Sequence, residues 1–173
     1  MRKLTVLTLM FAAGTVWLSA GEKMNMKPYD GSANFMRLKK LAGKWEGTGK
    51  MEGKDQKVSV EYRVTSGGSA LEERLSPGTP HEMISMYYDK GGKVAMTHYC
   101  MIGNRPEMEL KSADDKSLKF ELAKGGEVKP KDIHMHSLEI VFDGDKKMSQ
   151  NWISFEGGKP NKETTIFNYK RVK

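Results

Sequence analysis

The sequence predicts an all-β protein: a single antiparallel up-and-down barrel of about ten strands, with a short helix before the first strand. Apolar and polar residues alternate in short runs such as Val58 to Val64, which is the pattern of strands with one buried face. Turn signals such as Gly67-Gly68 and Asp143-Gly144-Asp145 separate the runs. A sheet of about ten strands leaves no unpaired edge strand when it closes into a barrel, so a barrel is expected. A sandwich of two sheets is the alternative.

The beginning of the chain is typical of a secretory signal. Arg2-Lys3 precede an apolar run from Leu4 to Leu18, and the small residues Ser19-Ala20-Gly21 follow. The run is shorter than the roughly 20 residues that a membrane-spanning helix needs. We therefore expect a periplasmic or secreted protein whose mature chain has no membrane span. The expected organisation is a signal peptide over 1–20, a flexible leader over 21–31 and a barrel domain over 32–173.

The domain is expected to begin with a short helix. Ser32 is a good N-cap, the apolar residues Phe35, Leu38 and Leu41 recur near helical spacing, and Gly43 ends the pattern. The strands that follow are expected over 44–50, 56–64, 70–75, 82–88, 93–100, 106–111, 117–122, 134–142, 147–155 and 163–172.

Composition narrows the class of partner. The formal net charge is +7, but the basic residues are interleaved with acidic ones and form no stripe with aromatic side chains, so no nucleic-acid partner is expected. Cys100 is the single cysteine, so no intramolecular disulfide can support the core. The sequence contains no phosphate-binding loop, serine-hydrolase elbow or zinc-protease motif. These observations favour a binding protein over an enzyme.

The two ends of the domain carry a family resemblance. The segment Leu41 to Gly49, LAGKWEGTG, resembles the start of calycin barrels, the group of lipocalins, fatty-acid-binding proteins and nitrobindins. Its G-x-W-x-G-x-G spacing is similar to that of the nitrobindin-type haem-binding barrels in particular. The last segment, Phe167 to Val172, resembles the final calycin strand, whose basic residue covers the tryptophan. In a meander of ten strands, the first strand starts and the last strand finishes at the same end of the barrel. Trp45 is therefore expected beneath Lys170 or Arg171.

The resemblance leaves the cofactor open. Nitrobindin-type barrels hold haem iron through a histidine late in the chain, and no histidine follows His136 in this sequence. The segment from Thr97 to Pro106 resembles one found in uncharacterised exported bacterial barrels, which implies no particular activity.

The histidines are the main candidates for a site. Strand alternation places His98 and Cys100 on the face of Val94 and Met96, and His134 and His136 on the face of Leu138, Ile140 and Phe142. If the apolar residues face inward, these four polar residues line the interior. Strand direction then places them at the end opposite Trp45, with His81 and Arg105 at the rim.

This arrangement predicts a pocket for an apolar or amphipathic small molecule. Its expected ligand-binding residues are His81, His98, Cys100, Arg105, His134, His136, Leu138, Ile140 and Phe142. An acidic ligand group would then bind more tightly when the histidines are protonated near pH 6. One alternative is a metal or haem site using His98, His134 and His136. A second is a thiol-dependent enzyme in which His98 activates Cys100. Glu72-Glu73 are expected on a solvated face.

Overall fold

The computed structural model describes residues 27–51 and 54–172. The expected signal peptide over 1–20 and the leader as far as residue 26 lie outside these described residues.

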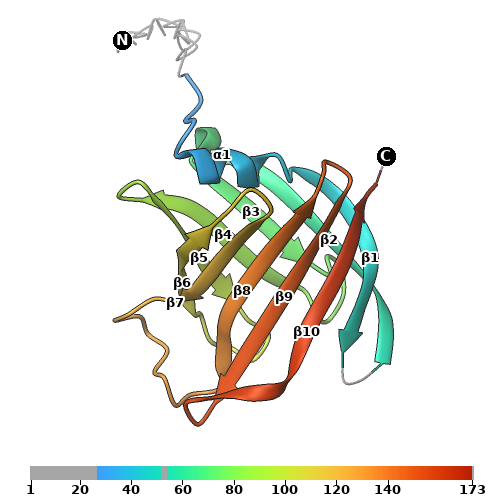
Figure 1. The fold of residues 1–173 in the computed structure, drawn as a ribbon, viewed down its shortest axis with the longest axis vertical. Helices are drawn as coiled ribbons and strands as arrows, with labels where there is room; N and C mark the ends of the chain where they lie inside the picture. Colours follow the sequence, from blue (N-terminus) through green and yellow to red (C-terminus); the bar gives the residue numbers. More distant parts are fainter. Residues whose placement is uncertain (1–26, 52–53, 173) are drawn as a thin grey trace, which may run out of the picture.

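Within the described residues, ten antiparallel strands form one closed barrel (Figure 1). Each strand pairs with the next strand of the chain, and the last strand pairs with the first. The predicted all-β up-and-down barrel is therefore confirmed, and the sandwich alternative is wrong. The strands are β1 (Gly43–Met51), β2 (Lys54–Thr65), β3 (Ala70–Leu75), β4 (Met83–Lys90), β5 (Lys93–Tyr99), β6 (Glu107–Ala113), β7 (Ser117–Leu122), β8 (His134–Asp143), β9 (Lys147–Glu156) and β10 (Lys159–Arg171).

A short helix, α1 (Ala33–Lys39), lies over one end of the barrel (Figure 1). It begins where expected, because the Ser32 hydroxyl accepts a hydrogen bond from the backbone N–H of Phe35 at 3.3 Å. Asp89, one residue before the end of β4, accepts hydrogen bonds from both the backbone and the hydroxyl of Ser32. Phe35 and Leu38 are buried against the core. Across residues 27–51 and 54–172, no helix has the length and apolarity that crossing a membrane requires.

Trp45 closes the barrel at the helix end. Its side chain is 1% exposed, and its indole N–H donates to the Leu41 carbonyl at 2.8 Å. The guanidinium carbon of Arg171 lies 4.2 Å from the centre of the indole ring, a cation–π contact. Arg171 also donates to the carbonyl oxygens of Ala42 and Lys40. Arg171, rather than Lys170, is thus the basic residue that covers the tryptophan.

Gly47 has a packing role in the pairing that closes the barrel. It lies opposite Tyr169 in the β1–β10 ladder. A Cβ atom at position 47 would lie 1.8 Å from the carbonyl oxygen of Asn168, closer than any real contact. A glycine at this position of the G-x-W-x-G segment therefore allows the two strands to approach.

Large buried side chains occupy much of the interior. Aromatic, methionine and aliphatic residues from all around the barrel form one buried cluster. Its largest fully buried members are Trp45, Tyr62, Tyr87, Phe35, Phe120, Leu38, Leu71, Met96, Met108, Leu118, Leu138 and Ile140. Within this apolar interior lie a few buried polar groups, which form the candidate site.

Candidate functional site

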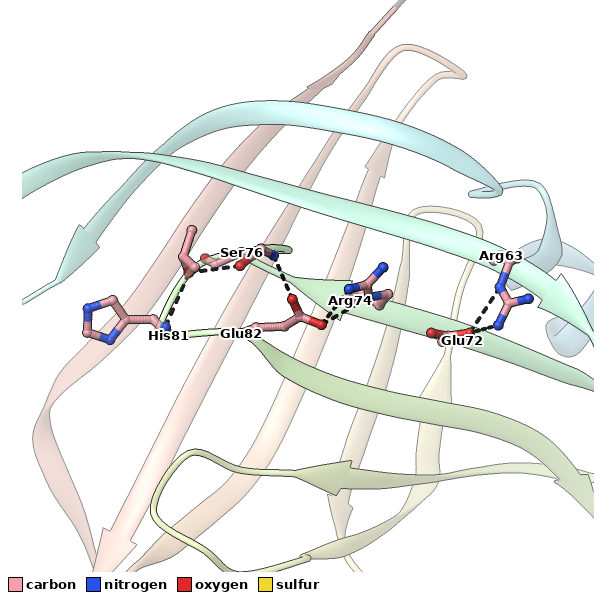
Figure 2. A network of polar contacts seen from close by, with 8 residues as sticks. Arg63, Glu72, Arg74, Ser76, His81 and Glu82 are labelled. Atoms are coloured by element: carbon pink, nitrogen blue, oxygen red, sulfur yellow. Dashed lines mark hydrogen bonds and ion pairs between the residues drawn. The ribbon is translucent and has the colours of Figure 1, made fainter.

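Glu73 is the most unusual residue of the interior. Its side chain has no exposed surface, whereas the neighbouring Glu72 pairs with Arg63 (Figure 2). The expectation that both carboxylates lie on a solvated face is wrong for Glu73. The same alternation that was applied to the histidines shows why: Glu73 lies between Leu71 and Leu75, which both face the core.

Four side chains hydrogen bond to the Glu73 carboxylate. The Tyr62 hydroxyl donates to Oε1 at 2.9 Å and the Tyr87 hydroxyl to Oε2 at 2.7 Å. The amide of Gln150, from the opposite side of the barrel, also donates to Oε1, and the Ser85 hydroxyl contacts the carboxylate as well. Gln150 in turn accepts from the Trp152 indole N–H at 3.2 Å. All these donors fit an acceptor-only carboxylate.

Burial controls the ionisation of this network. It raises the pKa of Glu73, and the hydrogen bonds from Tyr87, Gln150, Tyr62 and Ser85 act in the opposite direction without reversing the shift. Burial and the carboxylate together raise the pKa of both tyrosines far above the usual value. The network therefore supplies hydrogen bonds to Glu73, and the described residues show no ion pair between it and a lysine or arginine.

Replacing Tyr87 by phenylalanine is expected to destabilise the barrel by about 1–3 kcal/mol, because a buried carboxylate oxygen loses its donor. The measurement is urea-induced unfolding. Tyr88→Phe is the matched control, since Tyr88 is the next residue on β4 and faces the other side. Equal losses in the two variants would show that the hydrogen bond to Glu73 contributes nothing.

His98 extends this network toward the end opposite Trp45. Its Nδ1 lies 3.0 Å from the Ser85 hydroxyl, and its ring lies 4.8 Å from the ring of Trp152. The side chain is 1% exposed, and burial lowers its pKa to about 4. When the single Ser85 hydroxyl proton is donated to Glu73, Ser85 accepts from Nδ1–H of His98, and Nε2 is then a lone-pair acceptor. Nε2 is buried and has no hydrogen-bond partner in the structure.

The pKa values also correct the expected pH dependence. A histidine with a pKa of about 4 is neutral near pH 6. The pKa of His136 is lowered too, first by burial and then by the neighbouring His134. Tighter binding of an acidic group through protonation of these two histidines near pH 6 therefore finds no support.

His134 and His136 do not join His98 in the interior. The β8–β9 register shifts between Met135 and Ser137, and this irregularity brings Met135 against the core. His134 pairs across the ladder with Phe155, and the ring of His136 stacks on Phe155 at 3.6 Å. Phe155 is three residues from the inward Trp152, so the pair lies on the outer side of the sheet. The prediction that both histidines face the interior requires uninterrupted alternation along β8, and the bulge breaks that alternation.

The other predicted site residues are also dispersed. Cys100 lies in the turn after β5, where its N–H donates to the Asn104 carbonyl, and it is partly exposed. Arg105 forms an exposed ion pair with Glu127 at 2.5 Å. His81 lies in the turn before β4, and its imidazole points away from the polar contacts of Figure 2.

The three apolar residues predicted below the polar ring are divided between two places. Leu138 and Ile140 are fully buried in the interior, as expected. Phe142 lies at the helix end of β8, where the Arg37 guanidinium covers its ring at 4.2 Å. Phe142 is therefore far along the strand from the end that carries the histidines.

The structure does not gather the residues that the two alternative functions require. In the described part of the chain, no group of three or more His, Cys, Asp or Glu side chains could hold a metal ion. The ring of His98 contacts Ser85, and Cys100 lies beyond the end of β5. The expected activation of the thiol by His98 therefore has no geometric basis.

Two of the hollows of the described residues bear on the candidate site. The larger, about 1050 Å³, is an open groove over the outer side of strands β1, β2, β8, β9 and β10, lined by residues such as Glu46, Lys57 and Lys147. The smaller, about 580 Å³, lies at the end opposite Trp45 between Asn104, Arg105, Asp132 and Ile133. This second hollow is the one at the predicted end of the barrel.

Comparison with protein-family models and with curated proteins finds no match to the chain.

Proposed function

We propose that this protein is an exported calycin-like barrel that binds a small, largely apolar molecule carrying one hydrogen-bond donor. The observation behind it is the Nε2 atom of His98, which is buried without a hydrogen-bond partner and is a lone-pair acceptor when Nδ1 carries the proton. A buried polar atom left unpaired costs free energy, and a ligand that donates to it removes that cost. The export proposal rests on the signal-like pattern of residues 1–20.

The surroundings of His98 support an apolar ligand body. His98 lies one residue before the end of β5, against the ring of Trp152. Beyond it, the last residue of β5 and the loops at this end expose large apolar side chains: Tyr99, Met101, Ile102 and Ile133. The Asn104 side chain donates to the Ile133 carbonyl at 2.7 Å, which holds these loops together. An apolar rim beside a buried acceptor favours a ligand such as a phenol or an alcohol.

The same geometry disfavours an acidic ligand. Glu73 is connected to His98 through Ser85, and His98 itself is neutral near pH 7. A carboxylate placed beside His98 would bring a second negative charge into the interior without a cation to balance it. The proposed ligand group is therefore a neutral donor.

Phenol and toluene test the proposal, because they have the same ring and nearly the same size but only phenol donates a hydrogen bond. Wild-type protein is expected to bind phenol about five-fold more tightly than toluene, which corresponds to ~1 kcal/mol for one hydrogen bond. Binding is measured from the methionine methyl signals in NMR titrations. The ¹⁵N shift of His98 Nε2 should change with phenol alone.

Variants identify the acceptor. His98→Phe is expected to abolish the preference for phenol, whereas His81→Phe, at an exposed turn, keeps it. A preference that survives in His98→Phe would place the acceptor elsewhere. Failure of wild-type protein to bind either compound would refute the proposed pocket.

A further inference from the structure

His134 and His136, which do not face the interior, form a separate arrangement on the outer side of β8. His134 is fully buried and His136 is partly exposed, with Met135 between them turned toward the core. The bulge thus places two imidazoles on one side of the strand, next to each other and against Phe155. Neither ring takes part in the Glu73–His98 network.

The hydrogen bonds of His134 define its tautomer. Its Nδ1 lies 2.7 Å from the Asp132 carbonyl oxygen, which can only accept, so Nδ1 carries the proton. Nε2 is then a lone pair, and it faces Nδ1 of His136 at 3.1 Å. A histidine that donates one ring N–H to a backbone carbonyl while presenting the other nitrogen is the arrangement of metal-ligating histidines.

The distance between the two facing nitrogens also suits a metal. Two imidazole ligands at Zn–N distances of roughly 2.0–2.1 Å and a tetrahedral angle lie about 3.3 Å apart, close to the 3.1 Å observed. The stack of His136 on Phe155, with only 13° between the ring planes, fixes the orientation of the second ring. The two nitrogens can keep nearly this distance when an ion binds, while both rings turn so that their lone pairs meet at the ion.

A second unpartnered polar atom lies in the adjoining loop. The Asn104 side chain donates through Nδ2 to the carbonyl of Ile133, the residue before His134. Its Oδ1 is buried and without a hydrogen-bond partner in the structure. This oxygen can accept a further hydrogen bond.

We propose that His134 Nε2 and His136 Nδ1 bind one divalent transition-metal ion of the zinc and copper class, for which imidazole is a preferred ligand. Binding needs His136 to move its proton from Nδ1 to Nε2, and no proton is lost from the pair. Because the described residues offer no third His, Cys, Asp or Glu to the group, water completes the coordination. Such a site leaves coordination positions to exchangeable water, unlike a structural site in which the protein supplies all the ligands.

Titration of the full-length protein with Zn²⁺ alone, monitored by calorimetry, tests this site. Wild-type protein is expected to bind one equivalent, and His136→Asn to lose at least about ten-fold in affinity, since even outer-shell changes cost that much. Asparagine keeps a donor for His134, which protects the fold. His81→Asn, which removes an exposed histidine, should bind as the wild type does.

The spectrum of bound Cu²⁺ distinguishes coordination by the two histidines from a purely structural role of these residues. With one equivalent of Cu²⁺, the electron paramagnetic resonance spectrum of the wild type should show coupling to two imidazole nitrogens, and that of His136→Asn to one. Should His136→Asn fail to fold, His134→Gln serves as the second variant. Absence of one-equivalent Zn²⁺ binding in the wild type, or equal affinity in both folded proteins, overturns the proposal. Phenol binding at His98 is a separate measurement, so the two proposals fail independently.

Discussion

Replacing Trp45 by alanine is expected to lower the free energy of unfolding by about 3–5 kcal/mol, the range for removing a large buried aromatic side chain. Trp45 is 1% exposed, so the substitution leaves a cavity at the closed end. It also removes the ring beneath the Arg171 guanidinium and the hydrogen bond to Leu41. The measurement is chemical denaturation followed by circular dichroism.

The matched control is Ile166→Ala on β10, whose side chain is 41% exposed. An exposed substitution of this kind is expected to change stability by less than about 0.5 kcal/mol. A loss below about 1 kcal/mol in Trp45→Ala would mean that the end of the barrel collapses around the missing ring without penalty.

The second large effect is a loss of stability in acid through His98. The pKa of His98 is lowered from 6.5 to about 4 by burial. Below about pH 6.5, the unfolded chain takes up a proton on this histidine that the folded protein binds only near pH 4, so stability falls with pH across this window. The full shift corresponds to roughly 3 kcal/mol at 1.36 kcal/mol per pH unit.

The comparison with His98→Gln isolates this contribution, because glutamine does not titrate. Between about pH 7 and pH 4, the wild type should lose roughly 3 kcal/mol of its free energy of unfolding relative to His98→Gln. His81→Gln should follow the wild-type curve. Glu73, whose pKa is raised by burial, changes stability in the opposite direction, since its protonation favours the folded state. That contribution is common to both proteins, so a constant difference between them would refute the assignment to His98.

The barrel and most of its strands could be predicted from the sequence because their signals are local. A period of two and frequent turn residues define ten short segments, and the observed β3 and β7 occupy the predicted ranges 70–75 and 117–122. The closed end was predictable for a different reason: the order of a meander alone brings Trp45 next to Arg171.

The candidate site was predictable only in part. Alternation correctly places His98 inside, and applied to β3 it would also have identified Glu73 between Leu71 and Leu75. The positions of His134 and His136 could not be derived in this way. They depend on one extra residue in β8, and a bulge between Met135 and Ser137 leaves no clear signal in an alternating run. The extent to which large side chains fill the interior is likewise a property of packing across strands.

The β1–β10 ladder has a consequence for the order of folding. It pairs residues as distant in the chain as Trp45 and Arg171. Until β10 is available, β1 and β9 each present an unpaired edge, and such edges readily pair with other chains. Contacts between distant segments also slow folding. The barrel therefore closes only after its last strand has paired with its first.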